Sequence, residues 1–168
     1  MSLDRCEKFV RSDVSRHFGP PLRLFPSDVN ISLKVDIEGG QVNGSAVWTL
    51  TQRAEDATAL TLDAVNLDML TVECAEAVGL QYTYNGTKVQ LTWPAGTQLD
   101  GAKFLVSWSV RRPEAGMYFI GQIDQRTKAP YVGMFTDHET ERARYWLPCV
   151  DHPSFRTTVT LQLDTLGD

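Results

Sequence analysis

The sequence predicts an all-β fold, built as a strongly twisted double sheet or β-sandwich in which most strands are antiparallel. Three observations support this prediction: short runs of alternating apolar and polar residues, frequent turn signals, and no long segment with convincing helical periodicity. Alternation with a period of two gives a strand one apolar face and one polar face. Turn signals spaced about 8–12 residues apart are typical of sandwiches and barrels.

We predict two parts along the chain: an N-terminal lead-in segment at residues 1–28, and a β-domain at residues 29–168. Within the lead-in, residues 3–18 could form a short helix or an extended segment, because apolar residues recur there at spacings of three and four. Gly19 and the two prolines after it end any such helix.

The first predicted hairpin covers residues 29–51. Apolar residues occupy every second position from Val29 to Ile37, and polar residues fill the positions between them. Gly39 and Gly40 supply a turn, and residues 42–51 provide the return strand.

The remaining strands are predicted from the same alternation. Asn85 and Gly86 lie between two alternating runs, and Asn-Gly in that position is the strongest short-range signal for a hairpin. A third hairpin joins two runs through a polar turn at residues 124–128. The expected strands are residues 58–62, 67–74, 80–84, 88–93, 104–110, 117–123, 130–135 and 157–163.

Composition limits the classes of partner. The chain of 168 residues carries a net charge of -5, which argues mildly against nucleic acid and anionic membranes as partners. No apolar run approaches the roughly 20 residues of a membrane span. The first residues carry charges where a signal peptide has its apolar core. We therefore expect a cytoplasmic protein with no nucleic-acid or membrane partner.

The cysteines favour free thiols. Cys6, Cys74 and Cys149 are odd in number, lie far apart and lack any Cys-x-x-Cys spacing. A disulfide framework or a cysteine zinc site is therefore not expected.

The residue types that could support chemistry concentrate in the segment 136–155, TDHETERARYWLPCVDHPSF, which contains two of the three histidines. His138 begins like the His-Glu-x-x-His motif of zinc peptidases, but Arg142 stands where the second histidine is required. We therefore expect no metal site in this chain.

Two further interpretations of this segment concern its cysteine and its charges. Cys149 near His152 suggests a nucleophile and base, but Cys149 lies in a turn among hydrophobic residues, which favours a buried structural role. The charged residues Glu139, Arg142 and Arg144, together with Asp151, suggest an ion-pair network that fixes the loop. Alternatively, they form a loop that presents carboxylates to a cationic group such as a substrate amine.

Part of this segment resembles a known signature. Residues 142–155 resemble the "AR-x-x-FPC-x-D-x-P-x-x-K" segment of the zinc aminopeptidases related to aminopeptidase N and leukotriene hydrolase. Residues 60–67 resemble that family's "LDA-x-x-L" strand, and residues 116–119 resemble its "G-L/M-Y" step, in the same order and with matching spacing. The residues that form the structural motif here are Arg142, Arg144, Pro148, Cys149, Asp151 and Pro153.

The resemblance implies a saddle-shaped β-domain that packs on a thermolysin-like catalytic domain. In that family the catalytic domain holds the His-Glu-x-x-His zinc site and a Gly-x-Met-Glu-Asn loop, and neither motif occurs in this sequence. The expected parent is thus a zinc metallo-aminopeptidase, with zinc in the missing catalytic domain and no cofactor in this chain. Without that zinc site, this chain alone is expected to be inactive. Its implied partners are its own catalytic domain and peptide substrates.

The resemblance also implies a role in binding substrate. In the family, a Gln two residues before a Glu helps to bind the free amine and first side chain of the peptide. Counting back from Cys149 places these positions at Asp137 and Glu139. Asp in place of Gln is a departure, because a carboxylate accepts more strongly from an ammonium group but its side chain is one methylene shorter.

The implied function is to cap the catalytic cleft and help bind the free N-terminus of a peptide. Two alternatives stay open: a non-catalytic relative that serves as a scaffold, and a self-contained β-sandwich binding module.

Overall fold

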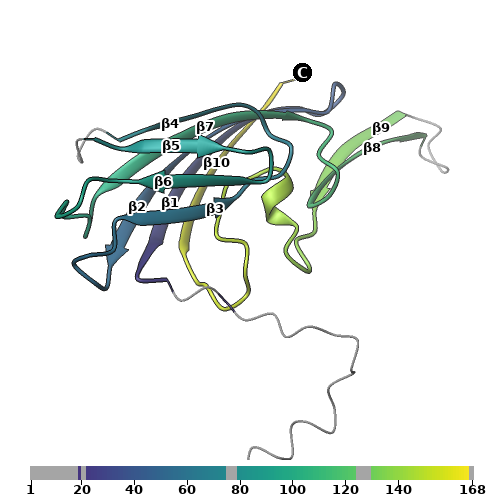
Figure 1. Ribbon diagram of the computed structural model, residues 1–168. Helices are drawn as coiled ribbons and strands as arrows, with labels where there is room; N and C mark the ends of the chain where they lie inside the picture. The colour runs from purple at the N-terminus through teal and green to yellow at the C-terminus, as the bar shows by residue number, and fades with distance from the viewer. Residues whose placement is uncertain (1–18, 20–21, 75–78, 124–129, 167–168) are drawn as a thin grey trace, which may run out of the picture.

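A computed structural model describes residues 19, 22–74, 79–123 and 130–166, and these form ten β-strands and one 3-10 turn (Figure 1). This result confirms the predicted all-β class. The elements are β1 (Leu24–Asp36), β2 (Gln41–Gln52), β3 (Ala59–Asp63), β4 (Asp68–Glu73), β5 (Gln81–Tyr84), β6 (Lys88–Thr92), β7 (Lys103–Arg111), β8 (Met117–Ile123), β9 (Pro130–Thr136), η3 (Ala143–Tyr145) and β10 (Thr158–Leu166).

The strands form two stacked sheets and a separate hairpin. The main sheet has the order β10-β1-β2-β7-β4, the second sheet has the order β3-β6-β5, and β8 pairs only with β9. In Figure 1 the second sheet lies over the main sheet, and the β8–β9 hairpin extends away from both at one end. Every strand pair is antiparallel except β1 with β10, which is parallel.

The core is built from the alternating apolar residues that predicted the strands. Eight apolar residues that alternate along β1, β3 and β6 are at most 4% exposed, and the polar residues between them face outward. Burying a side chain of this size contributes about 1.5–3 kcal/mol. These core residues are Val29, Ile31, Leu33, Val35, Leu60, Leu62, Val89 and Leu91.

The first strand begins earlier than predicted. β1 starts at Leu24 rather than Val29, so the last residues of the expected lead-in segment belong to the main sheet. The residues before Val29 were not predicted as strand because they include Pro26, and proline cannot donate a hydrogen bond to a neighbouring strand. The sheet accommodates it at a register shift between Pro26 and Asp28. Residues 3–18, for which a short helix or an extended segment was expected, lie outside the described residues. Among the described residues, no helix has the length and apolar character needed to cross a membrane.

The apolar face of the main sheet is only partly covered. Val159, Leu161 and Leu163 of β10 lie in register with buried residues of β1 and point to the same face. They are nevertheless 61%, 54% and 45% exposed, whereas their partners on β1 are 1–4% exposed. The covered core therefore ends between β1 and β10, and β10 is an edge strand with an exposed apolar face.

A glycine on β2 makes room for a tryptophan that links the sheet to the segment after β9. Gly44 lies opposite Trp108 of β7, and a Cβ atom at Gly44 would approach the Trp108 ring to 2.3 Å. The Trp108 Nε1–H donates to the carbonyl oxygen of Trp146 at 2.7 Å. The absent side chain at Gly44 thus permits a buried hydrogen bond between two distant parts of the chain.

We predict that Gly44→Ala destabilises the protein, because the added methyl group must displace the Trp108 ring from a closely packed core. The expected loss in the free energy of unfolding is about 1–3 kcal/mol, measured by chemical denaturation. Ser45→Ala is the matched control, because Ser45 is the adjacent residue on the opposite face of β2. Its expected effect is below about 0.5 kcal/mol. Equal losses for the two variants would contradict the steric explanation.

Candidate functional site

Residues 136–155, here called the motif segment, connect the β8–β9 hairpin to β10 and dock on the end of β3. Asp63 and Cys149 form an isolated antiparallel bridge, with backbone N–H to carbonyl distances of 2.7 and 3.0 Å. The Val65 N–H also donates to the Arg144 carbonyl oxygen at 2.8 Å. The motif segment is therefore joined to the second sheet by main-chain hydrogen bonds.

Arg144 is the centre of an ion-pair network inside the motif segment. Its Nε donates to Asp151 Oδ2 at 2.9 Å, and its Nη2 donates to Glu141 Oε2 at 2.7 Å and to the Asp151 carbonyl oxygen at 2.8 Å. Burial by itself would lower the pKa of the Arg144 guanidinium, but the nearby carboxylates outweigh burial and raise it. Arg144 thus stays charged and fixes the loop.

The network continues onto β3 through Asp63. The Lys88 Nζ donates to Asp63 Oδ1 at 2.7 Å, and the Asp151 backbone N–H lies 3.3 Å from Asp63 Oδ2. The Arg144 Nη1 lies 4.0 Å from Asp63 Oδ1. Charged side chains and main-chain bonds therefore hold the same junction.

The structure places Cys149 in the core. It is 8% exposed, and burial, together with Asp151 and Asp63, raises the pKa of its thiol well above the usual value, while Arg144 opposes this shift. The neutral thiol is a poor nucleophile. The imidazole of His152 instead contacts Ser154, with its Nδ1 at 2.7 Å from the hydroxyl oxygen. Pro148 is buried beside Cys149, and Pro153 is exposed at the following turn.

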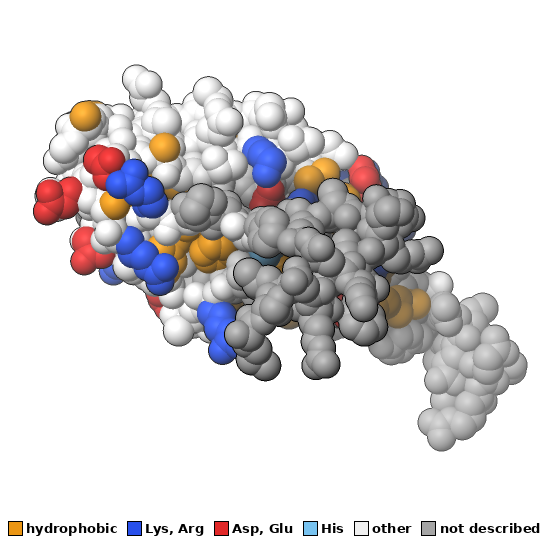
Figure 2. All heavy atoms as spheres, turned by 60° about the horizontal axis from the view of Figure 1, so that its bottom comes forward, with side chains coloured by type: hydrophobic (Ala, Val, Ile, Leu, Met, Phe, Trp, Pro, Cys, Tyr) orange, Lys and Arg blue, Asp and Glu red, His pale blue; other side chains and the backbone are white. Residues whose placement is uncertain are grey.

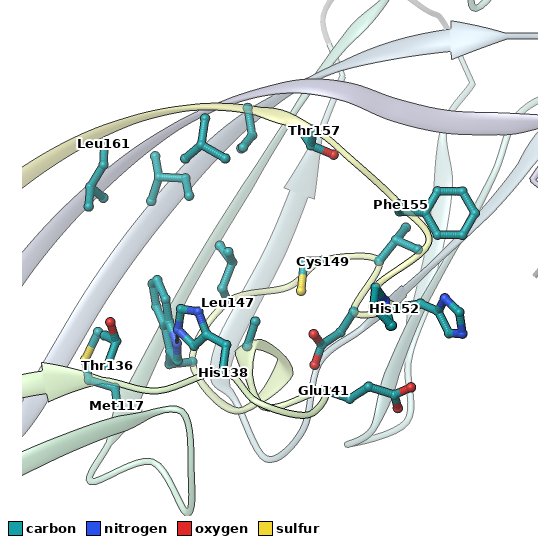
Figure 3. A pocket seen from close by; sticks show the side chains of 18 of the residues that line it. Met117, Thr136, His138, Glu141, Leu147, Cys149, His152, Phe155, Thr157 and Leu161 are labelled. Atoms are coloured by element: carbon teal, nitrogen blue, oxygen red, sulfur yellow. Dashed lines mark hydrogen bonds between the residues drawn. The ribbon is translucent and has the colours of Figure 1, made fainter. Parts of the chain in front are cut away.

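The motif segment and the open part of the main sheet enclose a groove of about 680 Å³ (Figure 3). One wall consists of apolar residues of β1 and β10, including the exposed Leu161. The other wall comes from the hairpin and the motif segment and includes Met117, Trp146 and Leu147. Three acidic residues, Glu139, Glu141 and Asp151, also line the groove. The groove is therefore largely apolar, with carboxylates on one side.

Figure 2 shows that acidic and basic side chains lie close together on the visible part of the described surface, with hydrophobic side chains between them. Charges of opposite sign are also close together inside the motif segment, where Arg144 forms ion pairs with Asp151 and Glu141.

The two predicted substrate-binding residues differ in their surroundings. Asp137 is absent from the groove lining, and its carboxylate lies 3.4 Å from Arg142 Nη1 and accepts from the Glu139 backbone N–H at 3.2 Å. Glu139 is exposed and lines the groove. In the described part of the chain, no hydrogen bond or ion pair engages the Glu139 carboxylate. Glu139 is therefore the carboxylate available for a cationic group, whereas Asp137 is already opposite a cation.

Arg142 and Gly116 fix this region to the base of the hairpin. The Asp137 backbone N–H donates to the Gly116 carbonyl oxygen at 3.0 Å, and Arg142 Nη1 lies 3.4 Å from the Tyr118 hydroxyl oxygen. Gly116 has a φ of +80°, and a Cβ there would lie 2.0 Å from the Arg142 carbonyl oxygen. This close approach and the positive φ explain why a glycine occupies position 116, at the start of the G-L/M-Y step.

Sequence reasoning missed the pair formed by His138 and Trp146. The Trp146 Nε1–H donates to His138 Nε2 at 3.0 Å, and the two rings lie 5.5 Å apart at 30°. The two residues lie eight positions apart in a segment with no strand and only the short turn η3, so no strand or helix periodicity signals the contact. Within the residues that the structure describes, no group of three or more His, Cys, Asp or Glu side chains is placed to hold a metal ion.

We predict that Arg144→Ala lowers the free energy of unfolding by about 2–4 kcal/mol, because it leaves Asp151, Glu141 and Asp63 without their shared cation. Chemical denaturation measures the loss. Arg23→Ala is the control, because Arg23 pairs with Asp56 at the surface, where both side chains are more than half exposed. That pair is expected to contribute less than about 1 kcal/mol. A small effect of Arg144→Ala would contradict the central role of the network.

Comparisons with known proteins agree with this architecture. The family model of the peptidase M1 N-terminal domain matches residues 25–166. A mutant two-domain M1 zinc metallopeptidase bound to L-tryptophan aligns with a TM-score of 0.62 at 20% identity over 84% of this chain and 33% of its own. The M1 zinc metallopeptidase from Deinococcus radiodurans gives a TM-score of 0.58 at 21% identity over 84% of this chain and 32% of its own.

A third solved structure covers nearly all of the chain. Native leukotriene A4 hydrolase from Saccharomyces cerevisiae aligns with a TM-score of 0.68 at 18% identity over 98% of this chain and 28% of its own. At these identities the structural matches show a shared fold. The chain spans no more than 33% of the length of any of these three proteins.

Proposed function

The chain belongs to the peptidase M1 N-terminal domain family, and on that premise we propose that it is the non-catalytic β-domain of a zinc aminopeptidase. In this proposal the domain packs against a catalytic domain of the same protein, caps its cleft and helps to bind the free N-terminus of a peptide. The observation that carries the proposal is the groove, in which an uncovered apolar wall lies near an unpaired carboxylate, Glu139.

The partner in this proposal is the rest of the parent protein. This chain aligns with only about a third of each of two solved proteins that share its fold, with 33% of one and 32% of the other. Val159, Leu161 and Leu163 form an exposed apolar row beside the core, which is typical of a surface that another structural unit covers. A self-contained binding module would be expected to cover such a row with its own residues, and this disfavours that alternative.

The proposed role in substrate binding rests on Glu139. A carboxylate at the edge of an apolar groove can accept a charge-assisted hydrogen bond from the ammonium group of a peptide N-terminus. Asp137 supports this geometry by accepting from the Glu139 backbone N–H, while Arg142 balances the charge of Asp137. Glu139 thus provides the direct contact, and Asp137 helps to hold Glu139 in place.

The chemical step in this proposal belongs to the catalytic domain. A zinc ion held there would supply the activated water for peptide hydrolysis. This chain would contribute binding and orientation of the substrate, in a cytoplasmic protein. Solved M1 metallopeptidases contain L-tryptophan in one case and L-arginine in another, so amino-acid derivatives with a free amine are suitable probes.

We predict that the 168-residue chain self-associates and binds a hydrophobic dye through the exposed row on β10. Leu161→Lys should reduce both effects, because a charge at the middle of the row opposes apolar contact. Analytical ultracentrifugation and dye fluorescence measure the change. Thr160→Lys is the matched control, because it adds the same charge to the same strand on the opposite face. A monomeric wild-type chain that binds no dye would refute the proposed docking surface.

We predict that Glu139→Gln weakens the binding of L-leucine amide, because the neutral side chain loses its attraction for the ammonium group. The expected loss in affinity is about three- to tenfold, measured by NMR titration. Glu38→Gln removes an equal charge from the exposed turn between β1 and β2 and should leave the affinity unchanged. N-acetyl-leucine amide lacks the ammonium group and should bind weakly to all three proteins. Equal binding of the free and acetylated amides would argue against the proposed function.

A further inference from the structure

The contact between Trp146 and His138 fixes where the imidazole carries its proton. The Trp146 indole nitrogen can only donate a hydrogen bond, and its Nε1 lies 3.0 Å from His138 Nε2. The Nε2 atom must therefore accept, and a neutral imidazole that accepts at Nε2 carries its proton on Nδ1. The contact thus selects one tautomer of His138.

Trp146 is well placed to impose this choice, because the body of the domain holds it from several sides. Its side chain is in the core, with the residue 5% exposed, and its carbonyl oxygen accepts the hydrogen bond from Trp108 Nε1. Its backbone N–H donates to the Ala143 carbonyl oxygen at 3.1 Å. The imidazole of His138 also lies against the indole, with ring centroids 5.5 Å apart. The orientation of the imidazole is therefore determined by the packed core.

The second nitrogen of His138, Nδ1, is available for a ligand in the groove. His138 is exposed at the groove wall, where Figure 3 shows its ring among the lining side chains. Across the residues that the structure describes, no hydrogen bond engages His138 Nδ1. The next residue, Glu139, lines the same groove with an unpaired carboxylate. A hydrogen-bond donor and an anionic acceptor thus occur at adjacent positions of the chain.

We propose that His138 is a ligand-binding residue whose Nδ1–H donates to a carbonyl oxygen of the peptide in the groove. This inference rests on the proposed function, in which Glu139 accepts from the ammonium group of the peptide. The first residue of a peptide carries its ammonium group and its carbonyl on the same α-carbon, so adjacent donor and acceptor side chains match that chemistry. The ligand class is an α-amino carbonyl compound with a free amine. Trp146 is the positioning residue that holds the donor in the required tautomer.

The tautomer is tested without any ligand. Nitrogen-15 NMR of the 168-residue chain at about pH 8, where a free imidazole is neutral, should show the His138 proton on Nδ1. Free histidine favours Nε2 for its proton, so the expected result differs from that of an unconstrained side chain. Trp146→Phe removes the indole donor and should shift the population towards the Nε2–H tautomer. An Nε2–H tautomer in the wild-type protein would overturn the inference.

The carbonyl contact is tested with two amines that carry the same branched apolar chain. L-leucine amide and isopentylamine share an ammonium group and a branched apolar chain, but only the amide has a carbonyl. NMR titration of the wild-type chain at about pH 7 should show tighter binding of the amide by about two- to tenfold, the usual effect of one hydrogen bond. His138→Phe keeps an aromatic ring against Trp146 and should abolish this preference. His138→Gln retains an N–H donor and should restore part of it.

His152→Phe is the matched control. His152 also lines the groove, but its Nδ1 already contacts Ser154, so replacing it should leave the preference unchanged. If the amide binds but His138→Phe keeps the wild-type preference, the role of His138 is refuted and the proposed function stands. If neither amine binds more tightly than N-acetyl-leucine amide, the proposed function fails and the inference fails with it.

Discussion

A partly buried guanidinium holds this domain together where its parts meet. Arg144 forms ion pairs with Asp151 and Glu141, and its guanidinium lies 4.0 Å from the Asp63 carboxylate. The backbone bridge between Asp63 and Cys149 lies at the same junction. A charge at this depth is tolerable only because it is paired and hydrogen-bonded. Without that junction, the segment between β9 and β10 would be a long loop with no fixed path, and the groove would lose one wall. The positions of Glu139 and His138 therefore depend on the Arg144 junction, although neither residue contacts Arg144.

The strands could be predicted from the sequence because the pattern that identifies each one lies within a few neighbouring residues. Alternation of apolar and polar residues is visible within a few positions, and the Asn85-Gly86 turn identifies its hairpin from two residues. The extension of β1 past Pro26 was missed, since proline normally interrupts a strand and only a register shift in the folded sheet accommodates it. The predicted motif named Arg144 and Asp151 by resemblance, whereas their geometry shows the physical reason for them. No local pattern links His138 to Trp146, because that contact exists only after the core has formed.

The acidic residues of the motif segment fall into two groups: those paired with an arginine, which stabilise the segment, and Glu139, which has no such partner. Asp151 and Glu141 line the groove, yet both are paired with Arg144, and Asp137 lies opposite Arg142. Paired carboxylates stabilise a conformation and attract a further cation only weakly. Glu139 differs because no cation opposes it in the described structure. Five charged residues lie within eight positions of the sequence, yet Glu139 is the one acidic residue among the described groove-lining residues whose carboxylate has no partner.

The parallel pairing of β1 with β10 has a consequence for biosynthesis. Asp28 lies beside Thr158 in the sheet, so the chain must leave the ribosome as far as Thr158 before this pair can form. Contacts between residues so far apart in sequence form slowly, because closing a long loop costs conformational entropy. During translation, β1 can pair at once with β2, but its other edge stays open until β10 emerges. Until then, the open edge of β1 can pair with other unpaired strands, which favours misfolding of the nascent domain.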